Sequence, residues 1–383
     1  MAPVPLCCSW NVGRMRIVYM LTSLGMGGAE RQVLELADRM VLRGHTVVLL
    51  VLRPGLAEEW PTALDVIHLG MHRSPLSVIA GMAKARRFLL AFRPDLLHSH
   101  SFHANLAARA LKVLVPSVTV ISTVHNVYEG GWPRMLAYHL TDGLAHRTVA
   151  VSKAAAERFV RLKAIPQHKC IVLANGIDIA LFKPDAERRE EKRTTMDAGG
   201  EFIWLAVGRI VPAKDYPTLL RAFAQVRASR GDARLWVAGA EASAAEAASV
   251  RALTTDLGLK DAVRWLGLCR DVPALLDAAD AYVMASAWEG MPLAVGEAMA
   301  MEKPVVATDA GGVREVVGAA GAIVPSRAPD ALASAMLHLM RSTPEERRTQ
   351  GRAARERIRE LFSMDAKADE WEALYRTVLE RRD

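Results

Sequence analysis

The chain has 383 residues, enough for two domains, and its composition (51% hydrophobic, 24% charged) is that of a globular protein rather than a disordered one. No apolar run approaches the roughly 18 residues that a membrane-spanning helix needs. The charge is uneven: residues 1–180 hold 20 Lys and Arg against 11 Asp and Glu, a net charge of +9, whereas the remainder holds 29 against 31, a net charge of −2.

The opening residues 1–14, MAPVPLCCSWNVGR, lack the charged and apolar regions of a signal peptide. We expect them to be a disordered tail, or not to belong to the native protein. Cys7 and Cys8 lie here, and neither they nor Cys170 and Cys269 have metal or redox spacing. A disulfide framework is therefore not expected, and this favours the cytosol.

The first series of elements begins at residues 16–22, RIVYMLT, which have the apolar run of a buried strand. The apolar spacing then predicts a helix from about Ala29 to Arg43, ended by Gly44, and a second strand over 45–52. A strand–helix–strand unit of this kind implies parallel strands and a right-handed crossover. Further strands are predicted at 65–69, 95–99, 118–123, 147–151 and 170–173. Together they define a first domain over 15–182.

Residues 183–200, KPDAERREEKRTTMDAGG, are polar and carry no strand signal, so we interpret them as a linker. A second alternating series follows and defines a second domain over 201–361. Its strands are predicted at 202–208, 234–239, 263–267, 281–286, 304–308 and 322–325. The fold class is therefore α/β, with two tandem doubly wound parallel-sheet (Rossmann-like) domains.

Candidate ligand residues follow the predicted strands, where parallel α/β sheets bind their ligands. In SLGMGGAER (23–31), Gly25, Gly27 and Gly28 separate a strand from a helix. Glu30 occupies the third glycine position of a dinucleotide-binding motif, so a dinucleotide site is not indicated. The glycines allow a ligand to approach the backbone closely, or they serve a tight turn.

The loop VGRIVPAKDYPTLL (207–220) places Arg209 and Lys214 five residues apart after the first strand of the second series. Arginine can bind a diphosphate through two N–H groups, and lysine adds a point charge. The alternative is a pair of surface cations. In TVHNVY, His125 follows a strand of the first series and falls in the same cleft-facing layer.

The stretch ASAWEGMPLAVGEAMA (285–300) carries two acids eight residues apart, Glu289 and Glu297. Pro292 suits the start of a helix, which we place at about Pro292 to Leu293. The unpaired N–H groups of that helix would bind phosphate, Glu297 would reach a ribose, and Glu289 would reach a group beyond the phosphate. A nucleotide-diphosphate sugar has this layout. The equal alternative is a solvated loop acid and a satisfied helix residue.

Three histidines, His98, His100 and His103, suggest a metal site at first sight, but no carboxylate or cysteine accompanies them. We interpret them as a packed or hydrogen-bonded cluster. The chain holds no Asp-x-Asp pair of the kind that holds a divalent ion on a diphosphate, so no metal and no other cofactor is expected.

Six motifs together resemble glycosyltransferase family 4, the retaining nucleotide-sugar transferases of the GT-B fold. They are GMGGAER, VAVSKA (149–154), NGID (175–178), VGRIVPAKDY, EGMPLAVGEAMA and DAGGVREVV (309–317), in the order of that family. The resemblance runs from Met15 over nearly the whole chain. It implies that residues 362–383 form a helix that crosses back onto the first domain, with Trp371, Leu374 and Tyr375 on one face. The alternative is packing on the second domain alone.

The resemblance also implies roles for residues. Glu297 would hold the ribose and Glu289 the sugar hydroxyls, while Arg209 and Lys214 would neutralise the diphosphate. The catalytic set is Glu289, His125, Arg209 and Lys214. The donor-binding set is Gly27, Gly28, Arg209, Lys214, Glu289, Gly290, Met291, Pro292, Leu293, Ala294 and Glu297. Ser152 and the NGID motif read as a helix cap and a turn. Glu241 stands where relatives often have a glycine, and no role is assigned there.

The predicted function is retaining transfer of a sugar from a nucleotide-diphosphate sugar to an acceptor hydroxyl. The opening motif is most similar to those of bacterial enzymes that build lipopolysaccharide, capsule and exopolysaccharide. The expected acceptor is lipid-linked or a growing glycan, and the expected location is the cytoplasm, at the inner face of the inner membrane. Two alternatives stay open: a nucleotide-sugar epimerase of related fold, and a non-catalytic nucleotide-sugar-binding component of an envelope assembly.

The basic first half fits a polyanionic partner or a merely basic surface. We expect no nucleic acid, because no strand combines aromatic and basic residues in the pattern of nucleic-acid binders. The stretch KARRFLLAFR (84–93) is instead the predicted contact with an anionic membrane.

Overall fold

The computed structural model describes residues 13–25, 27–53 and 62–380. Cys7, Cys8 and most of the predicted tail over 1–14 lie outside the described residues. The chain forms two compact units. The first takes in the chain up to Ser122, residues 144–146 and the chain from Tyr375 on; the second comprises Thr123–Gly143 and Arg147–Leu374.

The first sheet has seven strands in the order β3-β2-β1-β4-β5-β6-β7. Its strands are β1 (Arg16–Leu21), β2 (Thr46–Val51), β3 (Asp65–His68), β4 (Leu96–His100), β5 (Thr119–Val124), β6 (Arg147–Ala150) and β7 (Cys170–Val172). The central strand β1 pairs in parallel with both β2 and β4, through Ile17 opposite Val47 and opposite Leu96. All seven predicted strands are confirmed, because strands covered on both faces carry continuous apolar runs.

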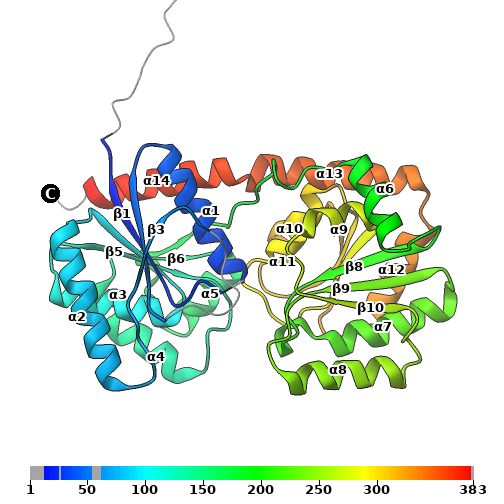
Figure 1. Ribbon diagram of the computed structural model, residues 1–383, viewed down its shortest axis with the longest axis horizontal. Helices are drawn as coiled ribbons and strands as arrows, with labels where there is room; N and C mark the ends of the chain where they lie inside the picture. The colour runs from blue at the N-terminus through cyan, green and yellow to red at the C-terminus, as the bar shows by residue number, and fades with distance from the viewer. Residues whose placement is uncertain (1–12, 26, 54–61, 381–383) are drawn as a thin grey trace, which may run out of the picture. The chain divides into compact units, whose positions relative to one another are not determined.

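Helices cover both faces of this sheet (Figure 1). They are α1 (Gly28–Leu42), α2 (Pro75–Phe92), α3 (Phe102–Leu114), α4 (Trp132–Thr141) and α5 (Lys153–Arg161), with the short 3-10 turns η1 (Asp142–Leu144) and η2 (Gln167–Lys169). One core lies under α2 and α3, where Leu89 and Leu111 join Val18 and Met20 of β1. Gly44, with φ of +86°, follows α1 at the predicted end of that helix.

The second sheet has six strands in the order β10-β9-β8-β11-β12-β13, and every neighbouring pair is parallel. The strands are β8 (Phe202–Val207), β9 (Ala233–Ala238), β10 (Val263–Gly267), β11 (Ala281–Met284), β12 (Val305–Thr308) and β13 (Ala322–Val324). All six predicted strands are present. The two parallel sheets with their helices are the expected Rossmann-like pair.

Helices on the two faces of the second sheet bury separate cores (Figure 1). The helices from residue 186 on are α6 (Ala186–Thr195), α7 (Tyr216–Ser229), α8 (Ala244–Asp256), α9 (Val272–Ala278), α10 (Leu293–Ala300), α11 (Val313–Val317), α12 (Pro329–Arg341) and α13 (Pro344–Phe362), with the turn η3 (Pro212–Lys214), and α14 (Met364–Glu380) follows them. Side chains of a strand alternate between faces. Trp204 therefore packs with the α7 and α12 side chains, and Leu205 packs with those of α9, α10 and α11.

The stretch predicted as a linker, 183–200, contains the helix α6. Asp185 caps it by accepting hydrogen bonds from two N–H groups of the first turn. Its arginines bind acids at and beyond the end of α9: Arg188 pairs with Asp277, and Arg189 lies 2.6 Å from Asp280. This polar segment is thus held to the second sheet's helices by ion pairs rather than by an apolar face.

The C-terminal helix α14 contacts the first domain, as predicted. The hydroxyl of Tyr375 lies 3.0 Å from that of Tyr19 on β1 and 2.7 Å from Nδ1 of His98 on β4. His98 and His100 are buried, with ring centroids 4.0 Å apart. The two histidines therefore form a packed, hydrogen-bonded cluster with tyrosines, and α14 is anchored to it.

Candidate active site

Glu289 lies in the loop after β11 and is held from two sides. Its Oε1 is 2.6 Å from Nζ of Lys214 and accepts a hydrogen bond of 2.7 Å from Oγ of Ser286. The residue is only 9% exposed. Among the described residues, none donates to its other oxygen, Oε2. The geometry fixes one carboxylate oxygen and leaves the second available to a ligand.

The helix α10 begins one residue after Pro292, which is its N-cap, so the predicted start is confirmed. No described side chain caps this end. The N–H groups of Leu293 and Ala294 donate to none of the described residues, and they carry the positive end of the helix dipole. Three features of an anion site therefore meet here: bare amides, the helix dipole and the nearby Lys214.

Glu297 is the fifth residue of α10 and is 6% exposed. Two buried tyrosines lie near the two glutamates. Burial raises the pKa of Tyr282, and electrostatic interactions with Tyr216, Glu297 and Glu289 raise it further. Burial likewise raises the pKa of Tyr216, with a smaller contribution from Glu289. Both phenols therefore stay neutral and can act only as hydrogen-bonding groups here.

The loop after β8 is shaped by glycines. The aliphatic stem of Lys214 packs over Gly208, whose carbonyl oxygen accepts a hydrogen bond of 2.5 Å from the hydroxyl of Tyr216. A Cβ at Gly239 would collide with that same carbonyl. Arg209 is exposed and makes no hydrogen bond or ion pair with any residue that the structure describes. The loop thus fixes Lys214 and leaves Arg209 extended into solvent.

His125, at the carboxyl end of β5, lies against Gly290. A Cβ at Gly290 would collide with the carbonyl oxygen of His125, and a Cβ at Gly311 (φ of +59°) would collide with that of Glu289. Only glycine allows backbones to approach this closely. Burial lowers the pKa of His125 to about 4, so the imidazole is neutral at physiological pH. The structure therefore places the backbone of His125 against Gly290, the residue that follows Glu289.

Glu129 belongs to the same loop, although the sequence did not single it out. Its carboxylate accepts a hydrogen bond of 3.0 Å from the backbone N–H of His125 and one of 2.7 Å from the hydroxyl of Tyr138. Burial raises its pKa to about 7, against the opposing effects of Tyr138, the His125 N–H and Arg134. An acid in a glycine-rich loop reads as solvated, and only the fold shows that it is partly buried and hydrogen-bonded.

The remaining family motifs have structural roles. Ser152 caps α5, as expected, by accepting from the N–H of Ala155 at 3.2 Å. Glu315 of the DAGGVREVV motif accepts from the N–H groups of Lys153 and Ala154 at 2.9 and 3.1 Å. In NGID, Asp178 accepts two backbone N–H groups and makes the expected turn. Glu315 was missed because its partners lie some 160 residues earlier.

Gly27 and Gly28 belong to the first unit. Gly27 is the N-cap of α1, and its N–H donates to the carbonyl of Gly25 at 2.8 Å. The tight turn that these glycines could serve is therefore present. Glu241, to which no role was assigned, pairs with Arg251.

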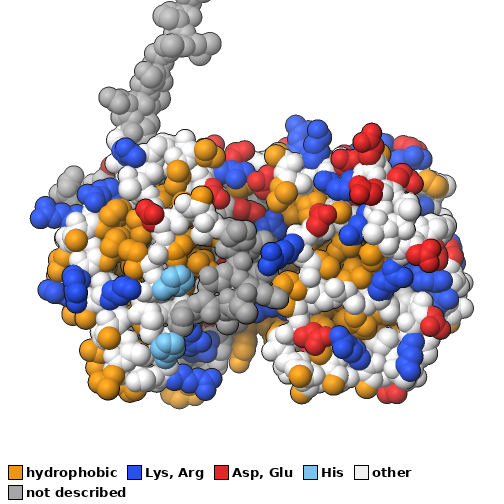
Figure 2. Space-filling model, viewed as in Figure 1, with side chains coloured by type: hydrophobic (Ala, Val, Ile, Leu, Met, Phe, Trp, Pro, Cys, Tyr) orange, Lys and Arg blue, Asp and Glu red, His pale blue; other side chains and the backbone are white. Residues whose placement is uncertain are grey.

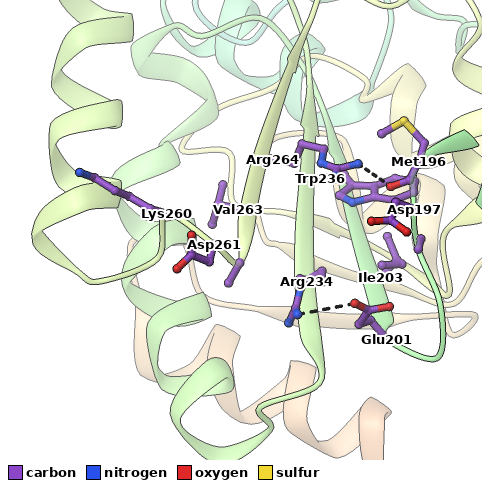
Figure 3. Close-up of a pocket in the computed structure, with 12 residues that line it drawn as sticks. Met196, Asp197, Glu201, Ile203, Arg234, Trp236, Lys260, Asp261, Val263 and Arg264 are labelled. Carbon is purple, nitrogen blue, oxygen red and sulfur yellow. Dashed lines mark hydrogen bonds and ion pairs between the residues drawn. The ribbon is translucent and has the colours of Figure 1, made fainter.

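A hollow of about 290 Å³ lies elsewhere, at the amino ends of β8, β9 and β10 (Figure 3). Its charged groups are partly bound to one another: Arg234 lies 3.6 Å from Glu201, and Arg264 donates to the carbonyl of Met196 at 2.6 Å. Ligands of parallel α/β sheets bind at the carboxyl ends of the strands. This hollow is therefore not the candidate site.

Within the described ranges there is no group of three or more His, Cys, Asp or Glu side chains suited to a metal ion. Of the helices that the structure describes, none is both long and apolar enough to cross a bilayer.

Comparisons with known proteins identify the family of the chain. Residues 26–181 match the family model "Glycosyltransferase Family 4", and residues 201–342 match "Glycosyl transferases group 1". A GDP-mannose-dependent alpha-mannosyltransferase of Mycolicibacterium smegmatis is 30% identical over 402 residues, which cover 96% of this chain and 99% of that protein. A UDP-Gal:alpha-D-GlcNAc-diphosphoundecaprenol alpha-1,3-galactosyltransferase of Escherichia coli is 25% identical over 238 residues, covering 57% of this chain and 58% of that one.

Among solved structures, Anabaena Alr3699/HepE in complex with UDP-glucose aligns with a TM-score of 0.83 and 20% identity, covering 95% of this chain and all of that one. This likeness identifies the fold as GT-B. The two sheets and the helix that returns to the first domain are those of a glycosyltransferase that uses a nucleotide-sugar donor. The chain belongs to glycosyltransferase family 4, whose members retain the anomeric configuration.

Proposed function

We propose that this glycosyltransferase acts in bacterial cell-envelope synthesis, on lipopolysaccharide, capsule or exopolysaccharide. Its acceptor is the hydroxyl of a lipid-linked or growing glycan. The opening motif supports this proposal, as does the Escherichia coli relative, which is named for a diphosphoundecaprenol-linked acceptor. Membership of family 4 favours transfer over epimerisation, and the intact set of charged residues argues against a non-catalytic role.

One observation carries the assignment of the donor site: the Glu289 carboxylate stands beside the uncapped N-terminus of α10 with Oε1 held and Oε2 open. In our proposal Oε2 accepts a hydrogen bond from a hydroxyl of the transferred sugar. The backbone from Gly290 to Ala294 meets the phosphates, and Glu297 binds the ribose further along the helix. The ribose, diphosphate and sugar of the donor thus follow the chain from Glu297 back to Glu289.

The departing diphosphate gains negative charge as the glycosidic bond breaks. Arg209, Lys214 and the α10 N-terminus stabilise that charge, because charges already in place need no reorganisation at the moment of reaction. These cations replace a divalent metal, so we expect transfer to survive a chelator. His125 lies beside the sugar and, being neutral, hydrogen-bonds to it rather than stabilising it by charge.

Retention in this scheme needs no enzyme nucleophile. The acceptor attacks from the side on which the diphosphate leaves, and a phosphate oxygen takes its proton. Gly27 and Gly28 allow the backbone of the first domain to approach the donor. Exclusion of water then protects the donor from hydrolysis.

Contact with an anionic membrane would bring the enzyme to such an acceptor on the cytoplasmic side. The residues that support it lie on and just after α2, where Lys84, Arg86, Arg87 and Arg93 are exposed. Figure 2 shows Lys and Arg side chains along the edge where Figure 1 places this helix. Such a cluster attracts anionic lipid by roughly 1 kcal/mol per charge near the surface.

The test separates the two acids. Glu297→Gln should weaken binding of UDP or another nucleoside diphosphate as well as of the intact donor. Glu289→Gln should bind the nucleoside diphosphate almost normally but turn over more slowly. The expected loss of transition-state stabilisation is on the order of 2–3 kcal/mol, the value of a charge-assisted hydrogen bond in a closed site. A panel of nucleotide sugars first identifies the donor, and calorimetry is then paired with transfer kinetics. Equal weakening of nucleoside diphosphate binding in both variants would refute this order along the helix.

A further inference from the structure

The outward face of α4 is apolar. Trp132, Leu136 and Leu140 are 72%, 41% and 73% exposed, and their spacing of four residues places them in one stripe along the helix. The inward face is also apolar, through the buried Met135 and Tyr138. A helix that is hydrophobic on both faces is ordinarily covered on both. The exposed stripe therefore indicates an interaction surface.

A groove of about 400 Å³ lies beside this stripe, between α4 and the C-terminal end of α5. Trp132, Leu136 and Leu162 line it, and so do the cations Arg158 and Lys163. The ring nitrogen Nδ1 of His139 bonds the carbonyl of Lys163 at 2.7 Å and ties the two helix ends together. The groove thus combines an apolar floor with a basic rim.

The acids of these elements do not neutralise that rim. Glu129 is partly buried, and its carboxylate accepts a hydrogen bond from the hydroxyl of Tyr138. Asp142 is buried and lies 3.3 Å from Lys169. Glu157 is exposed but lies one residue before Arg158, so it projects about 100° away around α5. The charge around the stripe is therefore positive.

We propose that α4 and this groove form a docking surface for an anionic lipid bilayer. Trp132, Leu136 and Leu140 enter the boundary between headgroups and acyl chains, and Arg158 and Lys163 bind lipid phosphates. Interfacial helices have this arrangement of an apolar stripe with cations beside it. The inference rests on the proposed lipid-linked acceptor. Its test measures membrane binding and does not require glycosyl transfer.

This surface differs in kind from the basic stretch 84–93 on α2. There Leu89 is buried, and Phe88 and Phe92 stack on each other with ring centroids 5.1 Å apart. Leu90 is 45% exposed, but four exposed cations accompany it, so the stretch presents more charge than large apolar side chains. We assign attraction over a distance to the stretch 84–93, and insertion into the bilayer to α4.

The groove also adjoins the candidate active site. Tyr128 lines it and packs edge-on against Trp288, with ring centroids 6.2 Å apart, and Trp288 immediately precedes Glu289. A bilayer held by α4 would therefore place lipid headgroups next to the residues proposed to hold the sugar.

The experiment compares binding to vesicles of phosphatidylcholine alone with binding to vesicles of equal parts phosphatidylcholine and phosphatidylglycerol. The variant Trp132→Ser/Leu136→Ser/Leu140→Ser should bind the anionic vesicles about 100-fold more weakly than wild type, since it loses three inserted apolar side chains. Because all three are exposed, the fold should be unchanged. The matched control Leu42→Ser/Val113→Ser/Leu181→Ser removes equally exposed but scattered side chains, and should lose less than about threefold.

Two further readouts complete the test. Brominated acyl chains should quench wild-type tryptophan fluorescence, and Trp132→Phe should abolish most of that quenching. Arg158→Gln/Lys163→Gln should remove much of the preference for phosphatidylglycerol. Wild-type binding by the triple variant, or unchanged quenching in Trp132→Phe, overturns the proposal. So does conversion of a wild-type oligomer to monomers by the triple variant, which would make the stripe an interface between copies. Calorimetry with UDP tests the donor site separately.

Discussion

Two cations in one loop are used differently. Lys214 is bound to Glu289, whereas Arg209 is extended and makes no contact with any described residue. Losing Lys214 leaves a mostly buried carboxylate without its counter-charge, while losing Arg209 leaves nothing unsatisfied in the protein. The same substitution should therefore have different consequences at the two positions.

We predict that Arg209→Ala lowers kcat/KM by an amount equivalent to roughly 2–4 kcal/mol, because it removes a preorganised charge from the leaving diphosphate. Its free energy of unfolding should equal that of wild type. Arg221→Ala is the matched control, since Arg221 is an exposed arginine on α7. Steady-state kinetics and urea unfolding make the measurement. Near-normal turnover in Arg209→Ala would dismiss the assignment.

Lys214→Ala should reduce both turnover and stability, and its effect should not add to that of Glu289→Gln. The ion pair of 2.6 Å places the two groups in one unit, for which we expect a coupling energy of about 1–3 kcal/mol. A double-mutant cycle in urea measures it. Additive effects would show that the pair contributes nothing as a pair in solution.

At the scale of elements, the loop 125–131 holds two partly buried groups whose titrations oppose each other. The pKa of Glu129 is raised to about 7, so its contribution to stability is full below its unfolded pKa of 4.5 and is lost as the pH rises through about 7. The pKa of His125 is lowered to about 4, so its contribution is present above its unfolded pKa of 6.5 and is lost as the pH falls through about 4. In the wild type the two trends largely cancel.

Glu129→Gln should remove the contribution of Glu129 to the pH dependence of stability and leave that of His125. The amide resembles the protonated acid, so it can still accept from the His125 N–H and bond the Tyr138 hydroxyl. Relative to wild type, the variant should become more stable by on the order of 1–3 kcal/mol as the pH rises from 4.5 to 7. Glu157→Gln, at an exposed acid, is the control. The free energy of unfolding of both proteins is measured with urea across this pH range. If the difference between variant and wild type did not change with pH, the raised pKa of Glu129 would be contradicted.

The elements that could be predicted are those whose pattern is local. The strands were predictable because buried parallel strands are continuous apolar runs, and the start of α10 because Pro292 marks it. The helix α6 was not, since its residues are polar on every face and its stability depends on Asp277 and Asp280, almost 90 residues away. Glu129 and Glu315 were missed for the same reason, because their burial and bonding arise from packing.

For the whole molecule, the question is where a nucleotide binds among the hollows that the fold creates. The sequence placed the donor at the carboxyl ends of the second series of strands, on the strength of Glu289, Glu297 and the loop cations. The hollow of Figure 3, at the amino ends of the same strands, also carries cations, Arg234, Lys260 and Arg264. Charge alone does not separate the two places. We favour the carboxyl ends of the strands, because the uncapped N-terminus of α10 and the open oxygen of Glu289 lie there.

Hydrogen exchange provides the decisive comparison. Saturating UDP should slow amide exchange over 207–216 and 285–297, because a bound diphosphate would order the loop after β8 and accept from the α10 N–H groups. Exchange over 196–203 and 260–264 should be unchanged. Glu297→Gln at the same UDP concentration should lose part of the protection, since it loses the ribose. Protection confined to 196–203 and 260–264 would place the nucleotide in the hollow of Figure 3 and would refute the donor site argued from α10.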